Sequence, residues 1–337
     1  MIEIDGSEGE GGGQILRSSL SLAICTGEPF RIVDIRANRD QPGLRRQHLT
    51  AVNAAARICN AEVDGAALAS RALTFRPRSL RAGDYSFDIG TAGSCTLVFQ
   101  TVLPALLTAT GESRVRILGG THNNGSPPFD FLARSFLPLL ARMGANVELT
   151  LESYGFYPRG GGEIRALIAP ARQLDALELA ERGKLLRGFA EAYVAAIPLH
   201  VAQRELEVIR RRLGFAPSDL MLQALPNDAG PGNAVTITLE HEHVTEVFTG
   251  FGEKGVPAEV VAERATEGAR VYLAAGATVD EHLADQLLLP MALGSGGSFT
   301  ARTVTPHLHS NAAVIERFTG RKVSVAPAGD CMQITVA

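Results

Sequence analysis

Two histidines near the C-terminal end of the chain have the residue type and the setting for chemistry on phosphate. His307 and His309 lie in a polar stretch just before a helix predicted over residues 310–319. The free N–H groups at a helix N-terminus favour anions such as phosphate, and an imidazole held beside a phosphorus atom can act as a nucleophile. The residues alone leave both histidines open as nucleophiles, with a surface or hydrogen-bonding role as the alternative.

The other common motifs of nucleotide chemistry are missing from this sequence. No stretch matches the phosphate loop GxxxxGK[ST], and Gly9 and Gly11 are not followed by the third glycine of a dinucleotide fingerprint. The three lysines, Lys184, Lys254 and Lys322, do not stand in the Lys-x-Asp-Gly arrangement of lysine-adenylating ligases. Histidine therefore carries the case for nucleotide chemistry.

Two glycine triplets could bring the backbone close to a ligand, because glycine has no Cβ. One lies in the run YGFYPRGGGEI at residues 154–164, which leads into a predicted strand. The other, Gly11 to Gly13, follows Glu10 and opens a predicted helix. A single triplet could be only a tight turn or bulge. Two of them in a chain with little low-complexity sequence suggest a phosphate-rich ligand.

Composition limits the classes of protein that can position these residues. With 337 residues, 45% of them hydrophobic and 20% charged, the chain has the profile of a globular protein with two domains. The net charge of −4 argues against a protein that coats long nucleic acids, although a few arginines could still hold one strand end. No apolar run is long enough to span a membrane, and the four scattered cysteines favour a reducing, cytoplasmic location.

The pattern of strands and helices repeats three times along the chain. Each unit has a helix, a strand, a polar loop, an amphipathic helix and a further strand. The first helices are predicted at about 14–26, 94–109 and 281–293, and the polar loops at 36–43, 121–128 and 305–310. Because the loops are equivalent, we expect them to face a common cleft. His122 lies in the second loop and is a candidate active-site neighbour by this symmetry only.

Residues 182–276 interrupt the repeats. An alternating strand at 235–243 lies between helical patterns at about 198–213 and 257–274. We expect a smaller α/β domain here, inserted between the second and third units. The larger domain then comprises residues 1–181 and 277–337. His241 and His243 share a face of the predicted strand and could bind a metal ion, but no third ligand is apparent.

Taken together, these motifs resemble the RNA 3′-terminal phosphate cyclase family over essentially the whole chain. The resemblance rests on an ordered set of segments: Gly9 to Arg17, Thr91 to Ser94, Ser126 to Pro128, Gly155 to Gly162, Gly252 to Lys254, His282 to Gln286, and His307 with Asn311. It implies an α/β (α+β) fold with three βαβαβ-type repeats that resemble the C-terminal domain of translation initiation factor three, plus an inserted smaller α/β domain.

The resemblance also implies a reaction. It is the ATP-dependent conversion of an RNA 3′-phosphate into a 2′,3′-cyclic phosphate through a covalent histidine-AMP and an RNA-adenylate. A phosphate monoester is a poor electrophile until it carries a good leaving group, and covalent catalysis divides that activation into two easier transfers. Matching the motif of the family selects His307 as the nucleophile. The partner is the 3′-phosphate end of an RNA, no membrane is involved, and a homodimer is one option.

The resemblance assigns ligand roles to further residues. Glu10 matches the glutamate that holds Mg²⁺ or Mn²⁺ on the ATP phosphates, a cation class that prefers oxygen ligands. The ATP-binding residues carried over are Gln100, Pro128, His282, Leu283, Ala284, Asp285 and Gln286. The family often has tyrosine where this chain has His282, so an imidazole replaces a phenol ring beside the adenine.

Arginines gather at the first polar loop, with Arg36, Arg39, Arg45 and Arg46 close in sequence and Arg17 on the helix before it. Arginine is a good bidentate ligand for phosphate, so we expect Arg17, Arg39 and Arg45 to hold RNA phosphates. A solvated helix start explains Arg45 and Arg46 equally well, and Arg39 is the strongest candidate.

Two other functions fit parts of the pattern. A non-catalytic RNA-binding or ribosome-assembly relative of the same fold would lack the nucleophile, whereas His307 and Glu10 are present here. An enolpyruvyl-transfer enzyme has a similar repeat architecture, but three lysines are few for clamping two anionic substrates.

Overall fold

The computed structural model describes residues 1–9 and 11–337 of the chain. It confirms the α/β class, because helices pack on several small mixed sheets. Three of these sheets have the same strand order and directions. In each, the first two neighbouring strands are parallel to each other, and the third is antiparallel to the strands on both sides of it. Each unit is thus βαβαββ, with one strand more than the predicted βαβαβ, because the last helix leads into a hairpin rather than a single strand.

The elements of the first unit are β1 (Ile2–Asp5), α1 (Gln14–Thr26), β2 (Phe30–Val33), α2 (Arg46–Cys59), β3 (Glu62–Asp64) and β4 (Leu73–Arg76). Those of the second are β5 (Asp84–Asp88), α3 (Cys95–Leu107), β6 (Ser113–Gly119), α4 (Phe129–Phe131), the π-helical turn η1 (Leu132–Phe136), α5 (Leu137–Arg142), β7 (Asn146–Ser153) and β8 (Gly162–Ala169). Those of the third are β9 (Leu177–Glu178), α8 (Glu281–Leu293), β14 (Gly297–Ala301), α9 (Pro306–Thr319), β15 (Val323–Ala328) and β16 (Cys331–Val336).

A fourth sheet lies between β9 and α8 in the chain. Its elements are β10 (Leu185–Ala195), α6 (His200–Leu213), the 3-10 turn η2 (Pro217–Asp219), β11 (Leu220–Ala224), the 3-10 turn η3 (Asn227–Ala229), β12 (Gly232–His241), β13 (Thr245–Phe251) and α7 (Ala258–Ala274). Because β9 pairs in parallel with β14, this segment interrupts the third unit. The prediction that it falls between the second and third units was wrong, since a two-residue strand such as β9 has no detectable pattern.

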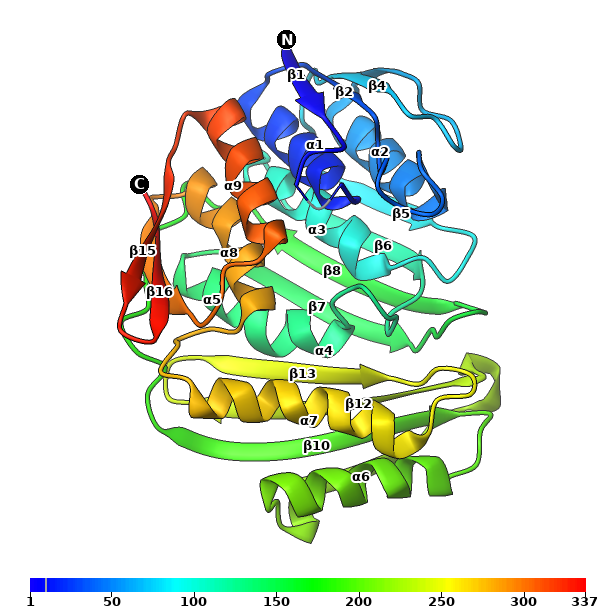
Figure 1. Cartoon of the computed structure of the whole chain (residues 1–337). Coiled ribbons are helices and arrows are strands. Elements are labelled where there is room, and N and C mark those ends of the chain that lie inside the picture. The colour runs from blue at the N-terminus through cyan, green and yellow to red at the C-terminus, as the bar shows by residue number, and fades with distance from the viewer. Residues whose placement is uncertain (10) are drawn as a thin grey trace.

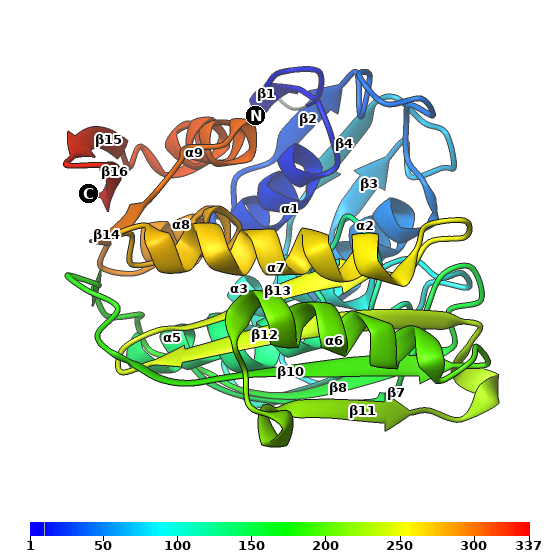
Figure 2. The same cartoon turned by 60° about the horizontal axis from the view of Figure 1, so that its bottom comes forward.

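Helices from all three units meet in the middle of the molecule. Helix α1 packs against both α3 and α9, and α8 packs against α9 (Figure 1). One apolar core runs through the three units, and the fourth sheet has a core of its own beneath α6 and α7. Figure 2 shows these two helices side by side on one face of that sheet. Within the described residues, no helix has both the length and the apolar character of a membrane span.

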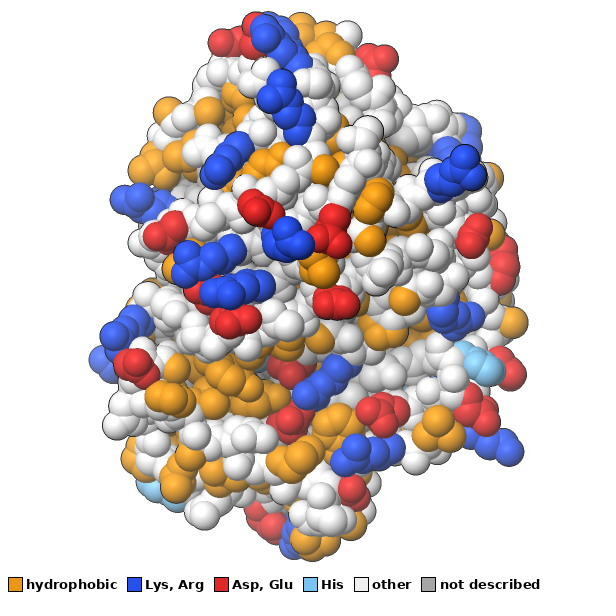
Figure 3. All heavy atoms as spheres, turned by 180° about the vertical axis from the view of Figure 1, so that it is seen from behind, with side chains coloured by type: hydrophobic (Ala, Val, Ile, Leu, Met, Phe, Trp, Pro, Cys, Tyr) orange, Lys and Arg blue, Asp and Glu red, His pale blue; other side chains and the backbone are white. Residues whose placement is uncertain are grey.

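Charged side chains do not form a continuous basic face on the back of the molecule. Figure 3 shows Lys and Arg side chains mixed with Asp and Glu across this surface. A protein that binds long nucleic acids normally presents a broad positive surface. This face does not present such a surface, in line with the net charge of −4.

Candidate active site

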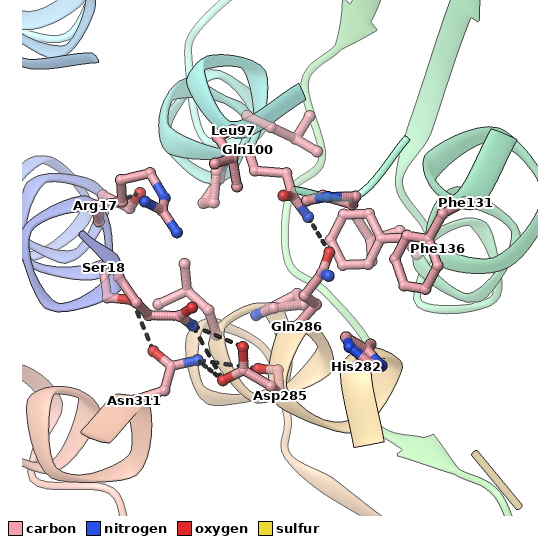
Figure 4. A pocket seen from close by; sticks show the side chains of 18 of the residues that line it. Arg17, Ser18, Leu97, Gln100, Phe131, Phe136, His282, Asp285, Gln286 and Asn311 are labelled. Carbon is pink, nitrogen blue, oxygen red and sulfur yellow. Dashed lines mark hydrogen bonds between the residues drawn. The ribbon is translucent and has the colours of Figure 1, made fainter. Parts of the chain in front are cut away.

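A cavity of about 800 Å³ lies where the helices of the three units converge. Its walls come from α1, α3, α8 and α9, from the loop at 124–128, and from β13 of the inserted segment. This volume is within the range of small-molecule sites. Figure 4 shows Arg17 and Ser18 from α1, Gln100 from α3, and Asp285 and Gln286 from α8 facing one another across it.

Most of the predicted ligand-binding residues lie on this cavity. The lining includes Arg17, Gln100, Pro128, His282, Asp285, Gln286 and His307. Leu283 and Ala284 do not contribute to it, because their side chains are fully buried in the apolar core on the other face of α8. Sequence matching selected a continuous segment, whereas a helix presents only part of its residues to one side.

His307 lies in the first turn of α9, since that helix begins at Pro306 and not at the predicted residue 310. Thr305 caps the helix by accepting a hydrogen bond from the backbone N–H of Leu308 at 3.1 Å. The His307 side chain is half-buried in the cavity, and His309, two residues further on, is exposed to solvent. Two residues correspond to about 200° around a helix, so only His307 of the pair faces the cavity.

The surroundings of His307 favour an uncharged imidazole. Burial lowers the pKa of His307; the nearby charge of Asp285 raises it, while Arg17 and Arg39 add to the lowering. A neutral ring keeps a nitrogen lone pair available at neutral pH, as a nucleophile requires. The position at a helix N-terminus also suits an anionic ligand.

Asp285 joins three helices at the base of the cavity. Gln14 of α1 donates to its carboxylate at 2.8 and 3.0 Å, and Asn311 of α9 donates to its backbone carbonyl at 3.0 Å. Ser18 in turn donates to the side-chain oxygen of Asn311 at 2.7 Å. Burial raises the pKa of Asp285, against the effect of these hydrogen bonds and of His307 and Arg17. The network holds the carboxylate beside His307 with its position fixed from all three helices.

Two amides and a histidine lie along the α8 side of the cavity. Gln100 of α3 donates a hydrogen bond to the side-chain oxygen of Gln286. Amides of this kind can recognise the edge of a base or a phosphate oxygen. His282 lies at the first turn of α8, with Nδ1 2.8 Å from Oδ2 of Asp280 and its side chain 75% exposed. That hydrogen bond raises the pKa of His282, and the negative charges of Asp280, Glu281 and Asp285 add to the effect.

The three predicted phosphate-binding arginines have different settings. Arg17 lines the cavity, and burial lowers its pKa to about 10, which leaves it charged at neutral pH. Arg39 and Arg45 are exposed on the first unit and do not line the cavity, although the charge of Arg39 reaches His307. Arg36 donates to the carbonyl oxygens of Gln41 at 2.6 Å and Gly43 at 3.1 Å, so its guanidinium supports its own loop.

The two glycine triplets differ in what they approach. Near Gly13, an added Cβ would lie 2.4 Å from Nε2 of His48 and 2.9 Å from Nη1 of Arg17, so this triplet borders the cavity region. Near Gly155, it would lie 2.4 Å from the Gly119 carbonyl and from the Gly162 nitrogen. Gly155 and Gly162 therefore pack against each other's backbone, whereas Gly161 has open space around it. Residues 154–162 are not among those that line this cavity. That the triplet Gly160 to Gly162 approaches a ligand stays a prediction.

Some residues of the site had no role in the sequence analysis. Gln14 and Ser18 complete the Asp285 network together with Asn311, which the motif had named without a role. His48 accepts a hydrogen bond from the backbone N–H of Arg45 at 3.3 Å. Burial and the charges of nearby arginines lower the pKa of His48 to about 3. Gln14, Arg17 and Ser18 are spaced by three and four residues from Gln14, which places them on one helix face. This spacing is a signal that could have identified Gln14 and Ser18 from the predicted Arg17.

The predicted metal ligand, Glu10, lies outside the described residues. In the part of the chain that the structure describes, no group of three or more His, Cys, Asp or Glu side chains is placed to hold a metal ion. His241 and His243, the pair considered as metal ligands, are therefore not part of such a group. Strand β12 ends at His241, and His243 lies in the turn beyond it.

Comparisons with known proteins place the chain in a family. A family model described as RNA 3′-terminal phosphate cyclase matches residues 8–325. A protein of that name from Koribacter versatilis is 52% identical over 337 residues, which is 100% of this chain and 95% of the relative. Another from Ralstonia nicotianae is 54% identical over 337 residues, covering 99% of this chain and 96% of the relative.

Among solved structures, the enolpyruvyl transferase NikO from Streptomyces tendae is 13% identical with a TM-score of 0.38. The match covers 99% of this chain and 48% of that one. A likeness at this level carries no information about function. The family model and the full-length relatives, by contrast, agree with the motifs and confirm both the resemblance and the prediction of an enzyme. The chain belongs to the RNA 3′-terminal phosphate cyclase family.

Proposed function

We propose that the protein converts an RNA 3′-phosphate into a 2′,3′-cyclic phosphate at the expense of ATP, with His307 as the nucleophile. The observation that carries the proposal is the placement of His307, half-buried at a helix N-terminus in a cavity that also contains Arg17 and Asp285. Burial lowers the pKa of His307, which favours the neutral, nucleophilic imidazole. Family membership and the names of the relatives give the reaction type.

In the proposed first step, a ring nitrogen of His307 bonds to the α-phosphorus of ATP and pyrophosphate leaves. A terminal phosphate oxygen of the RNA then bonds to that phosphorus, and the bond to His307 breaks. The vicinal 2′-hydroxyl finally attacks the RNA phosphate, releases AMP and loses its proton. The guanidinium of Arg17 supplies positive charge beside the reacting phosphates, and Asp285 holds the helices that position His307.

The nucleotide base has a proposed place along α8. Gln100 and Gln286 present amide groups to the cavity, and His282 and Pro128 provide flat or rigid surfaces on its wall. A divalent cation, Mg²⁺ or Mn²⁺, would be held by the ATP phosphates together with Glu10 and would neutralise charge on the leaving pyrophosphate. Mg²⁺ sites of this type rely on substrate phosphates and few carboxylates, so a cluster of protein ligands is not required.

The remaining parts of the proposal concern setting and fold. Free cysteines at positions 25, 59, 95 and 331 favour a reducing compartment such as the cytoplasm. The shared βαβαββ order of the three units supports a common repeat, for which we propose a likeness to the C-terminal domain of translation initiation factor three. A homodimer stays a prediction.

An RNA with a labelled 3′-terminal phosphate tests the proposal. Incubation with the protein, ATP and Mg²⁺ should make the label resistant to phosphatase, because a cyclic diester has no terminal monoester. An end that lacks the 2′-hydroxyl should stop at the adenylylated 3′-phosphate. If the label stays sensitive to phosphatase and no adenylate forms on either substrate, the protein is a non-catalytic relative or acts on another acceptor.

A further inference from the structure

A buried carboxylate of the inserted segment is bonded to the helix that carries His282. Glu246 lies on β13 and is 1% exposed. Its Oε1 accepts a hydrogen bond from the backbone N–H of Asp280 at 2.7 Å. Burial raises the pKa of Glu246 well above its ordinary value, and the charge of Asp280 adds to the effect. A buried carboxyl group is costly unless its hydrogen bonds are made, so this contact calls for an explanation.

Asp280 continues the connection into the cavity. It is the N-cap of α8, and its side chain accepts a hydrogen bond from the backbone N–H of His282 at 3.3 Å. The same carboxylate oxygen lies 2.8 Å from Nδ1 of His282. Two hydrogen-bonded steps therefore lead from Glu246 to the imidazole. A histidine whose Nδ1 is held in this way has a fixed ring orientation and presents Nε2 to its surroundings.

The chain just before Asp280 is held by other contacts. Tyr272 donates its hydroxyl hydrogen bond to the carbonyl of Thr278 at 3.0 Å, and Thr278 bonds to the backbone of Thr300 on β14. Arg182 donates to the carbonyls of Tyr272 and Leu273 where the two crossings to the inserted segment meet. These hydrogen bonds hold the chain between α7 and α8 in place, whereas Glu246 contacts Asp280, the residue that caps α8.

The same strand also forms part of the cavity wall. Val247 and Thr249 of β13 line it, next to Phe131 and Phe136 of the second unit. The inserted segment thus contributes both a surface and a hydrogen-bond acceptor to the site.

We propose that Glu246 is a positioning residue of the nucleotide site: it holds Asp280, and Asp280 fixes the ring of His282 at the cavity. The inference rests on the proposed function in one respect, namely that ATP binds in this cavity. The inserted segment then takes part in nucleotide binding through two hydrogen bonds, one from Asp280 to Glu246 and one between Asp280 and His282.

A matched pair of substitutions tests the proposal without any nucleotide. Glu246→Gln keeps a side-chain oxygen for the Asp280 N–H and has the shape of a protonated glutamate, whereas Glu246→Ala removes the acceptor. The pKa of His282 can be followed by NMR titration of its ring. Asp280 raises that pKa, with smaller contributions from Glu281 and Asp285, and His307 lies near the ring as well. Glu246→Ala should lower the His282 pKa towards its ordinary value of 6.5, and Glu246→Gln should leave it unchanged.

Adenylylation kinetics supply the second readout. Glu246→Ala should raise the KM for ATP about three- to tenfold, the effect of one lost hydrogen bond, and leave kcat nearly unchanged. When His282 is already alanine, Glu246→Ala should add nothing further, because the two residues act in one chain of contacts. If Glu246→Ala does not fold, Asp280→Asn replaces it, since the asparagine keeps the N–H and removes the charge that raises the His282 pKa.

The outcomes separate this proposal from the function on which it rests. An unchanged His282 pKa in the folded Glu246→Ala or Asp280→Asn protein overturns the positioning role, whatever the enzyme does with ATP. The positioning role is also overturned if Glu246→Ala raises the KM for ATP by the same factor whether residue 282 is histidine or alanine. Wild-type protein that does not react with ATP, but whose His282 pKa responds to Glu246→Ala, would overturn the proposed function and leave the connection in place.

Discussion

His122 and His307 lie at equivalent places of two repeated units, between the second strand and the second helix or in its first turn, and the structure gives them opposite settings. Each follows the second strand of its unit, β6 for His122 and β14 for His307. His122 has a fully buried side chain, whose Nδ1 is 2.9 Å from the Thr121 hydroxyl and whose Nε2 is 2.8 Å from Asp130. His307 lines an open cavity and is only half-buried.

The surroundings of His122 explain why its ring is not available to a ligand. The rings of Tyr154, Phe156 and Tyr193 lie 5.1 to 5.7 Å from it between centroids. Asp130 also accepts from the Tyr193 hydroxyl at 3.2 Å and pairs with Arg134 at 3.1 Å. Burial raises the pKa of Asp130, but the hydrogen bond and charge of His122 and the charge of Arg134 hold it below its ordinary value.

The comparison shows that equivalent positions of a repeated fold can have different surroundings. In the second unit, the loop histidine joins a closed network that reaches Glu191 and Thr238 of the inserted segment through Arg134. In the third unit, the equivalent loop opens a helix towards a cavity. A role for a histidine therefore follows from what its two ring nitrogens contact, and the symmetry argument that made His122 an active-site neighbour does not hold for its ring.

The largest expected difference between the two histidines is in stability. Replacing His122 by alanine leaves Asp130 buried without one of its partners, so we expect a loss of about 3–5 kcal/mol in the free energy of unfolding. His307→Ala should cost less than about 1 kcal/mol, because that side chain borders an open cavity. Urea unfolding of the two variants measures both values. Equal losses of unfolding free energy in the two variants would contradict the difference between a buried, bonded His122 and a His307 that borders a cavity.

Asp285 gives the next largest effect, on chemistry rather than on folding. Asp285→Ala leaves Gln14 without its acceptor and removes the 3.3 Å contact of Asn311 with the carboxylate, so the link between α1 and α8 near His307 is lost. A small displacement of a reacting group can cost about 100-fold in rate, and we expect a loss of this order in protein-AMP formation. Asp285→Asn keeps most of the shape and should lose less. Equal rates for the alanine variant and the wild type would remove Asp285 from the site.

The pH dependence of adenylylation sharpens the description of His307. In the proposed mechanism the neutral ring is the reactive form, and burial lowers the pKa of His307 from the ordinary value of 6.5. The rate should therefore hold down to pH values below 6.5 and then fall about tenfold per pH unit. Because Asp285 raises the pKa of His307, Asp285→Asn should move this acid limb to lower pH. A pH profile of the single-turnover adenylylation rate measures this fall. A rate that already falls at pH values above 6.5 would contradict a lowered pKa for His307.

Arg39 should show the smallest effect of these substitutions. Its side chain is exposed and outside the cavity lining, so Arg39→Ala should slow cyclisation of RNA 3′-phosphate about two- to fivefold and spare protein-AMP formation. Arg17→Ala is the matched comparison, because Arg17 lines the cavity and should affect both steps. Separate assays of the protein-AMP and the cyclic product distinguish the two arginines.

Local patterns predicted some elements to the residue and failed where a partner elsewhere decides the structure. The bounds of α1 and α8 were predicted correctly, since a glycine follows the last residue of each helix. The strand β9 was missed because two residues paired to β14 have no pattern of their own. For the site, Gln100, Asp285 and His307 were placed on the cavity by motif, but Leu283 and Ala284 were not separable from their neighbours without knowledge of the helix face.

The central claim is that His307 receives AMP from ATP, and the position of the modified residue tests it most directly. The protein is incubated with ATP and Mg²⁺, digested, and mapped by tandem mass spectrometry under conditions that preserve an acid-labile phosphoramidate. The account predicts AMP on His307, persistence of the modification in His309→Ala, and its loss in His307→Ala. AMP on His309 or on any other residue, or its persistence in His307→Ala, would contradict the account.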